Sequence, residues 1–330
     1  MQEAIGSGVF PGAVVLVARR GIVAWHQAFG HAQVVPAPRP MRADTIFDLA
    51  SLTKVIGTLP GALHLWQGGA YTLDTPVDSI LPEYAGAPHG RVTIRQLLSH
   101  TAGFVSWRAL YLSISNREQV LQAILQIPLQ HAPGTTVEYS DLGIILLGFA
   151  MERVANARLD AFLSQDVFRP LELTETTYTP PKAWWARCAA TEAGHAYERQ
   201  KLADASGRKP DRADVICGEV HDGNAYYAME GVAAHAGLFS TAWEVATVAL
   251  QWIRPSSFLP DHVIQEATRL QTSGAQGTPR GLGWILHHPE AFFAALGPRS
   301  FGHTGFTGTS IAIDPDADLL VVLLTNRVHP

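Results

Sequence analysis

Hydrophobic positions form strand-like runs near both ends of the chain and recur at helical spacing between them. Two apolar runs, 12–18 and 22–25, flank Arg19-Arg20-Gly21, which is typical of a β-hairpin with a glycine at the turn. Further strand-like runs follow near the other end, at 281–286, 309–313 and 319–325. Between them the periodicity predicts helices at 51–67, 93–100, 117–127, 142–154, 160–166, 241–253 and 261–272.

This order of elements predicts an α+β fold. One antiparallel β-sheet flanked by helices would be built from the N- and C-terminal segments, with a mainly helical region inserted. We expect residues 1–55 and 240–330 to form the sheet domain and residues 56–239 to form the helical domain. Residues 174–230 are rich in Pro, Gly, Asp and Arg, and a long stretch without periodicity is usually a functional surface. The loop 174–239 is therefore expected to line a cleft.

Composition narrows the class of protein. The 330 residues are 47% hydrophobic and 16% charged with a net charge of −5, which predicts a folded core and no nucleic-acid partner. No apolar run has the length of a membrane span. The chain begins without a signal peptide, so we expect a cytoplasmic location, or an extracytoplasmic one if a leader has been removed. Cys188 and Cys217 lack metal-ligand spacing, and their pairing and the oligomeric state stay open.

Ser51 and Lys54 are the first candidates for chemistry. They lie three residues apart in the predicted helix 51–67, so their side chains share one face. A lysine beside a serine can accept the hydroxyl proton and make the serine a nucleophile. Because burial lowers the pKa of a lysine, we expect Lys54 to be neutral or to share a proton. In the first helical turn, Ser51 would also lie among free N–H groups that stabilise negative charge.

A second Ser-x-x-Lys match, Ser206 to Lys209, lies in a run rich in Gly, Pro and charged residues. Such a run is typical of a loop, which would not hold both side chains on one face. We therefore favour Ser51 as the nucleophile.

Two further segments suit the same chemistry. Tyr139-Ser140-Asp141 begins the apolar helix 142–154, where a tyrosine can relay a proton if a cation lowers its pKa from about 10. An ordinary capping turn is the alternative. The glycine-rich segment 302–308 precedes a strand and can bring N–H groups close to an oxyanion, although a plain hairpin entry has the same composition.

His221, Asp222 and His235 suggest a metal site or a triad. Their spacing matches no common ligand signature, so no metal is expected. A Ser-His-Asp triad stays open because triads are defined by geometry, but no serine lies in a Gly-x-Ser-x-Gly elbow.

Six segments in order give the chain its resemblance to a family. They are Phe47-Asp-Leu-Ala-Ser-Leu-Thr-Lys54, Leu73-Asp-Thr-Pro-Val77, the run 92–103, Tyr139-Ser-Asp141, Gly237-Leu-Phe-Ser-Thr241 and Gly302-His-Thr-Gly305. Together they resemble the serine β-lactamase and penicillin-binding-protein superfamily. The branch is that of class C β-lactamases, DD-peptidases and family VIII carboxylesterases, and the chain looks most like the penicillin-binding-protein 4B type. The resemblance implies a β-lactamase/transpeptidase-like fold.

The resemblance also implies roles for individual residues. Ser51 matches the acylated nucleophile, Lys54 the lysine that activates it, and Tyr139 the tyrosine that passes protons to the leaving group and to the deacylating water. The backbone N–H groups of Ser51 and Phe306 match the oxyanion hole. Substrate contacts are expected from Asp141, His221, Asp222, His303, Thr304 and Gly305. No metal or organic cofactor is implied.

Two departures from the family motifs bear on the substrate. Asp141 replaces the asparagine of Tyr-x-Asn, and His303 replaces the lysine of Lys-Thr-Gly, which removes a permanent positive charge. The expected function is therefore a serine hydrolase that forms an acyl-enzyme with small esters or amides. A β-lactamase or a DD-peptidase acting on cell-wall peptides is the alternative, and a catalytically silent scaffold of the same fold is a third.

Overall fold

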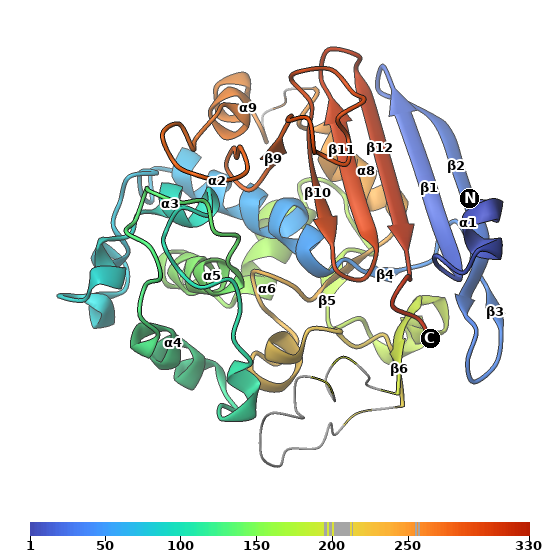
Figure 1. Ribbon diagram of the computed structural model, residues 1–330, viewed down its shortest axis with the longest axis horizontal. Coiled ribbons are helices and arrows are strands. Elements are labelled where there is room, and N and C mark those ends of the chain that lie inside the picture. The colour runs from blue at the N-terminus through green and yellow to red at the C-terminus, as the bar shows by residue number, and fades with distance from the viewer. Residues whose placement is uncertain (195–196, 198–199, 201–211, 213, 255, 257) are drawn as a thin grey trace.

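The computed structural model describes residues 1–330 except 195–196, 198–199, 201–211, 213, 255 and 257. Its main feature is a seven-stranded sheet in the order β3-β2-β1-β12-β11-β10-β9, with every neighbouring pair antiparallel. The chain's first and last long strands therefore lie side by side at the centre of the sheet (Figure 1). The predicted sheet from N- and C-terminal segments is confirmed.

The strands of this sheet are β1 (Gly12–Arg19), β2 (Ile22–Gln33), β3 (Arg39–Pro40), β9 (Ile285–Leu286), β10 (Phe301–Gly305), β11 (Thr309–Asp314) and β12 (Leu319–Thr325). A second sheet joins β4 (Phe47–Asp48), β8 (Leu238–Ser240) and β5 (Thr177–Tyr178), and a third pairs β6 (Ala190–Ala193) with β7 (Val215–Cys217).

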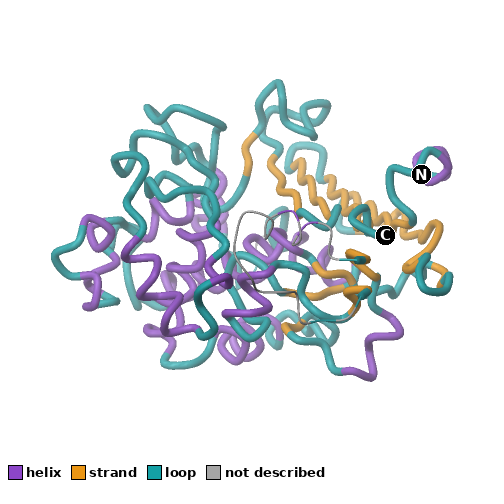
Figure 2. The backbone as a smooth tube through the Cα atoms, turned by 60° about the horizontal axis from the view of Figure 1, so that its bottom comes forward, coloured by secondary structure: helices purple, strands orange, loops and turns teal. Residues whose placement is uncertain are grey.

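The α-helices of the described residues are α1 (Gln2–Gly6), α2 (Leu59–Gln67), α3 (Ile94–Leu98), α4 (Arg117–Gln126), α5 (Asp141–Ala155), α6 (Leu159–Leu163), α8 (Ala242–Leu250) and α9 (Asp261–Thr268). Figure 2 shows most helices gathered at one end of the molecule and the long strands at the other. Helix α8 instead packs against β1 and β12 of the sheet. The division into domains at residues 55/56 and 239/240 stays a prediction.

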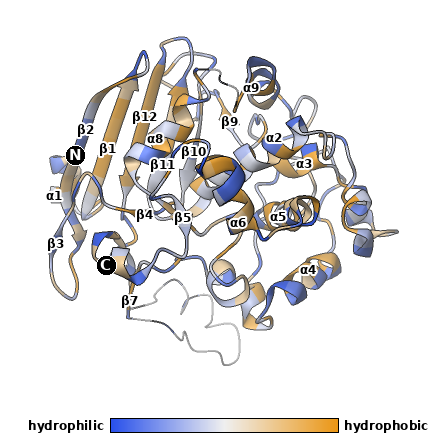
Figure 3. Ribbon diagram, turned by 180° about the vertical axis from the view of Figure 1, so that it is seen from behind, coloured by the Kyte–Doolittle hydropathy of each residue, from blue (hydrophilic) through white to orange (hydrophobic). Residues whose placement is uncertain are grey.

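One continuous core joins the two ends. Buried residues of β1, α2, α5 and α8 belong to the same hydrophobic cluster. Helix α5 is buried along most of its length, and it and the central strands are coloured hydrophobic in Figure 3. The Ser140 side chain caps this helix by accepting a hydrogen bond from the Gly143 N–H, as a serine at an N-cap does. Asn156 ends the helix in the left-handed conformation.

Some elements differ from the expectation. The helix predicted at 51–67 is composite: a 3₁₀ turn at Ala50–Leu52, a π-helical turn at Lys54–Thr58, and then α2. The strand predicted at 281–286 is paired only at Ile285–Leu286, and the β6–β7 pair lies in a region for which no strand was predicted. Ser206 to Lys209 lies outside the described residues.

Candidate active site

The turn that carries Ser51 is fixed by a buried aspartate. Ala50, directly before Ser51, has a φ of +46°, a conformation that is uncommon for a residue with a side chain. The Asp48 carboxylate stabilises it by accepting hydrogen bonds from the Ala50 N–H at 2.8 Å and the His221 N–H at 2.7 Å. Burial raises the pKa of Asp48, although the two N–H donors oppose the shift. We did not predict this role; its one signal in the sequence is a carboxylate within an apolar stretch.

The sheet holds the same turn from the other side. The Thr307 hydroxyl donates to the Asp48 carbonyl at 2.8 Å, and the Thr309 hydroxyl donates to the Leu49 carbonyl at 2.9 Å. A Cβ atom on Gly305 would lie 2.5 Å from the Leu49 carbonyl oxygen, so only glycine permits this approach of the two backbones. The end of β10 is therefore fitted directly against the nucleophile's backbone.

Lys54 lies beneath Ser51 and is fully enclosed. Its Nζ is 2.9 Å from Ser51 Oγ, 2.9 Å from the carbonyl oxygen of His235 and 2.8 Å from Asp141 Oδ1. The Lys54 side chain is 2% exposed and that of Asp141 is 17% exposed. Three oxygen atoms thus surround the ammonium group.

The pKa of Lys54 corrects one expectation. Burial lowers it, as we predicted, but the Asp141 carboxylate and then Tyr139 raise it by more, so the net shift is upward. Lys54 is therefore an ammonium ion at rest. Asp141, which we predicted to contact substrate, is the counter-ion of Lys54, although it also lines the cavity.

Four nitrogen-bearing side chains surround the ring of Tyr139. Lys54 Nζ lies 4.9 Å and Arg280 Cζ 5.3 Å from the ring centroid. The His100 and His303 rings lie 4.6 and 5.8 Å from it, centroid to centroid. Burial and the charges of Arg280 and Lys54 hold the pKa of both histidines well below the usual range, so both are neutral. The positive charges of Lys54 and Arg280 thus lie against the electron-rich ring of Tyr139.

Arg280 supplies the positive charge that His303 lacks. Its side chain is buried and lines the cavity, and burial lowers its pKa to about 10, which leaves it charged at neutral pH. Among the residues that the structure describes, its Nε and Nη1 atoms have no hydrogen-bond partner and no carboxylate pairs with it. Arg280 could not be identified from the sequence, because it is a single charge directly before a predicted strand.

Because His100 and His303 are buried in the neutral form, we expect the folded protein to lose stability at acid pH. Their folded-state pKa values are depressed, so their contribution to stability is present above the unfolded value of about 6.5 and is lost as the pH falls below it. Lowering the pH from 7.5 to 5.5 should cost about 1.4 kcal/mol of unfolding free energy per histidine, measured by urea titration. About half of this loss should disappear in His303→Gln and none in His262→Gln, whose side chain is exposed. Equal pH dependence in all three proteins would contradict the prediction.

The segment after β10 closes one wall of the site. His303 donates from Nδ1 to the Thr304 carbonyl at 2.8 Å, while the Thr304 side chain is exposed in the cavity. Phe306 is 43% exposed and stacks on His221 at 5.4 Å between ring centroids. Arg327 Nη2 donates to the Phe306 carbonyl at 2.8 Å and so anchors the residue whose N–H, in the preceding peptide group, we predict for the oxyanion hole. The position of Arg327 could not be inferred from the sequence.

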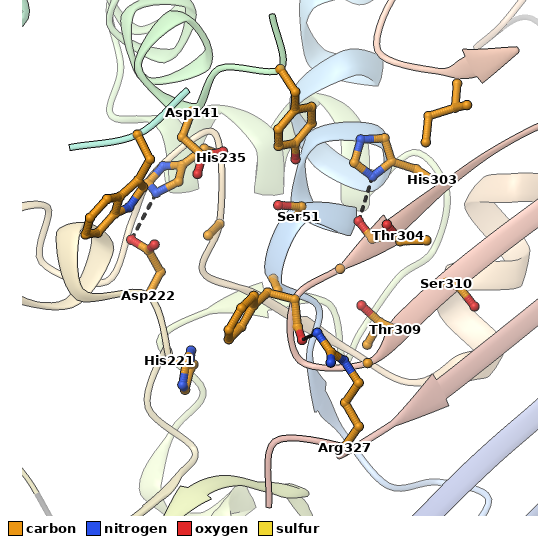
Figure 4. A pocket seen from close by; sticks show the side chains of 18 of the residues that line it. Ser51, Asp141, His221, Asp222, His235, His303, Thr304, Thr309, Ser310 and Arg327 are labelled. Carbon is orange, nitrogen blue, oxygen red and sulfur yellow. Dashed lines mark hydrogen bonds and ion pairs between the residues drawn. The ribbon is translucent and has the colours of Figure 1, made fainter. Parts of the chain in front are cut away.

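The opposite wall carries His221, Asp222 and His235 (Figure 4). His221 Nε2 lies 3.1 Å from Glu192 Oε2, and His235 Nε2 lies 3.0 Å from Asp222 Oδ1. Burial opposes ionisation of Asp222, but His235 and the Ala225 N–H outweigh it and lower the pKa of Asp222 to about 2. A histidine–aspartate pair thus exists, but it is not hydrogen-bonded to Ser51.

These walls enclose a cavity of about 700 Å³. Every predicted site residue except Lys54, which lies just beneath Ser51, lines it: Ser51, Tyr139, Asp141, His221, Asp222, His303, Thr304, Gly305 and Phe306. Trp107, Phe292 and Arg327 also line it and were not predicted. Within the described ranges, no group of three or more His, Cys, Asp or Glu side chains could hold a metal ion, and no helix there has the length and apolarity to span a membrane.

A buried Ser-Lys pair, a facing tyrosine and a glycine-bearing strand beside them are the marks of a hydrolase of the serine β-lactamase and penicillin-binding-protein superfamily. A family profile described as Beta-lactamase matches residues 1–330, and the chain belongs to this family.

Relatives and solved structures agree with this assignment. The chain is 30% identical over 357 residues to the "N-acetylmuramyl-L-alanine amidase" of Bacillus subtilis, covering all of this chain and 80% of the relative. It is 30% identical over 350 residues to the "Putative D-alanyl-D-alanine carboxypeptidase" of Escherichia coli K12, covering 97% of this chain and 79% of the relative. The structure of EstCE1, "a hydrolase with promiscuous acyltransferase activity", has a TM-score of 0.78 at 25% identity, covering 98% of this chain and 91% of that one. A class C β-lactamase from Rhodobacter sphaeroides, at 22% identity and a TM-score of 0.73 over all of this chain and 93% of its own, shares the fold.

Proposed function

We propose that the protein hydrolyses carboxylic esters and amides through an acyl-enzyme on Ser51. The observation that carries this proposal is the 2.9 Å contact between Lys54 Nζ and Ser51 Oγ at the floor of the cavity. A buried ammonium beside a serine stabilises the negative charge that develops on Oγ as the proton leaves.

The proposed reaction has two halves. In the active form the coupled pair of Lys54 and Tyr139 has released one proton. Ser51 Oγ attacks the substrate carbonyl while its own proton passes to this pair, and the N–H groups of Ser51 and Phe306 stabilise the oxyanion. The same pair returns the proton to the leaving alcohol or amine as the carbonyl–heteroatom bond breaks. Water then attacks the acyl-enzyme by the reverse sequence of proton transfers and releases the carboxylic acid.

Covalent labelling tests this proposal. A fluorophosphonate should add one adduct to the intact protein, and peptide mapping should place it on Ser51. Hydrolysis of a p-nitrophenyl ester should be lost in the labelled protein. An unlabelled protein without ester turnover would instead favour a catalytically silent scaffold, and a stable cephalosporin adduct without turnover would favour a penicillin-binding role.

The unpaired Arg280 favours a second candidate, a substrate with a carboxylate. A buried cation without a counter-ion is costly, and a ligand carboxylate would supply the missing partner. Peptides that end in a carboxylate and β-lactams both provide one, and the Escherichia coli relative is named "Putative D-alanyl-D-alanine carboxypeptidase". The absence of the motif lysine at position 303 therefore does not by itself favour neutral substrates.

Replacing Arg280 by glutamine should separate the two candidates. We expect kcat/KM for an acyl depsipeptide whose leaving group carries a carboxylate to fall roughly 10- to 100-fold, because a hydrogen bond to a charged group is lost. The same depsipeptide with that carboxyl amidated should be affected less than threefold, and Arg269→Gln, on the exposed side of α9's end, serves as the control. If both substrates lose activity equally, Arg280 supports Tyr139 and does not select the substrate.

A further inference from the structure

Asp222 presents one unused carboxylate oxygen to the cavity. Its Oδ1 accepts hydrogen bonds from His235 Nε2 at 3.0 Å and from the Ala225 N–H at 2.8 Å. Its Oδ2 has no hydrogen bond to any residue that the structure describes, and the side chain is 23% exposed where it lines the cavity. The carboxylate is therefore ionised, held in one orientation and open to a ligand.

His235 is the residue that holds Asp222 in place. Its ring is 1% exposed, so it cannot itself contact a substrate, and its backbone carbonyl accepts a hydrogen bond from Lys54 at 2.9 Å. The position of Asp222 is thereby tied to the lysine that contacts Ser51. The wall that carries Asp222 is consequently fixed in position relative to Ser51.

The cavity has charges of opposite sign on its two sides. Arg280 lies beside Tyr139, whose ring is also close to His303. Figure 4 shows His303 and Asp222 on opposite sides of Ser51. Arg280 is buried, lines the same cavity and has two nitrogen atoms without a partner in the described part of the chain, which independently indicates that this cavity receives a charged ligand. A scissile carbonyl at Ser51 would place the two parts of the substrate toward opposite charges.

We propose that Asp222 binds a free ammonium group in the acyl part of the substrate, so that the preferred substrates are esters or amides of amino acids or of short peptides with an unblocked amine. This inference rests on the proposed function of Ser51 and adds its substrate class. Asp222 makes the charge-assisted hydrogen bond, and His235 acts as its positioning residue.

A series of methyl esters tests the inference in the wild-type protein. The acyl parts are amino acids with one to five methylenes between the carboxyl and the amine, each compared with its N-acetylated form by following acid release. At one length the free amine should give a kcat/KM roughly 10- to 100-fold above that of the acetylated ester, the value of a hydrogen bond between charged groups. Equal rates at every length would overturn the inference without any variant.

Asp222→Asn gives the matched test. It keeps the shape and the acceptor for His235 but removes the charge, so the ratio of kcat/KM between the free-amine ester and the acetylated ester should fall to less than threefold. Glu219→Gln removes the same charge from the same loop at a different pocket and should leave the preference intact. A preference that survives Asp222→Asn would overturn the assignment of Asp222.

If Ser51 is not a nucleophile, the experiment gives a result that differs from failure of the ammonium site. In that case no ester, free or acetylated, would be hydrolysed, and binding would be measured directly by calorimetry with the primary amide of each amino acid in the series. Binding that is lost in Asp222→Asn would still support the ammonium site, and no binding to the wild-type protein would overturn it.

Discussion

Replacement of Ser51 by alanine should lower kcat for a p-nitrophenyl ester by about 10,000-fold or more, the scale seen when the nucleophile is removed from other serine hydrolases. The nucleophilic oxygen is lost, whereas Lys54 keeps its contacts with Asp141 and the His235 carbonyl. The fold should therefore survive, and the melting temperature should change by only a few degrees. Initial rates and thermal melts of the two proteins measure both effects.

The chain provides its own control for this experiment. Ser206 is the serine of the other Ser-x-x-Lys match, and Ser206→Ala should retain full activity and full labelling by a fluorophosphonate. Turnover that persists in Ser51→Ala but disappears in Ser206→Ala would reverse our choice between the two.

Asp141→Asn should move the ascending limb of the pH profile of kcat/KM to lower pH by about 1–3 units. The Asp141 carboxylate raises the proton affinity of the buried cluster formed with Lys54 and Tyr139. Removing that negative charge lets the cluster release its proton at lower pH, whichever of Lys54 and Tyr139 is the formal base. Activity should rise at pH values below the wild-type limb, because more of the enzyme is then ready to accept the Ser51 proton.

The same change should weaken the fold, since it leaves a buried ammonium without its counter-ion. We expect a loss of about 3 kcal/mol in unfolding free energy at neutral pH, measured by urea denaturation. Asp44→Asn removes a carboxylate from an exposed ion pair and should leave both the stability and the pH profile nearly unchanged. A limb that stays in place or moves to higher pH in Asp141→Asn would show that Asp141 does not set the proton affinity of the cluster.

Periodicity alone predicted the elements that form the frame. The hairpin of β1 and β2, the apolar helix α5 and the last two strands each combine a strong hydrophobic pattern with a turn or capping signal. The two-residue strands β4 and β5 are held by their pairing with β8 and have too few residues to show a pattern of their own. Long periodic segments were therefore predictable, and short strands defined by long-range pairing were not.

The residue types at the candidate site could be predicted from the sequence, but the protonation states and charged partners of these residues could not. Ser51, Lys54 and Tyr139 were identified from spacing and motif, and the structure brings them together. The protonation of Lys54 was predicted in the wrong direction because only burial was considered, whereas its pKa depends on a carboxylate 87 positions later in the chain. Arg280 and Asp48 were missed for the same reason: their effects depend on long-range contacts.

The contact of Gly305 with the Leu49 carbonyl constrains how this enzyme can be re-engineered. In a saturation library, position 305 should accept glycine alone, because even a methyl group would push the reactive turn away from the strand. Variants with new substrate preferences should instead be found at Thr304, Trp107 and Phe292, whose side chains border the cavity. Directed evolution of this scaffold would thus proceed through the rim of the pocket while its innermost backbone stayed invariant.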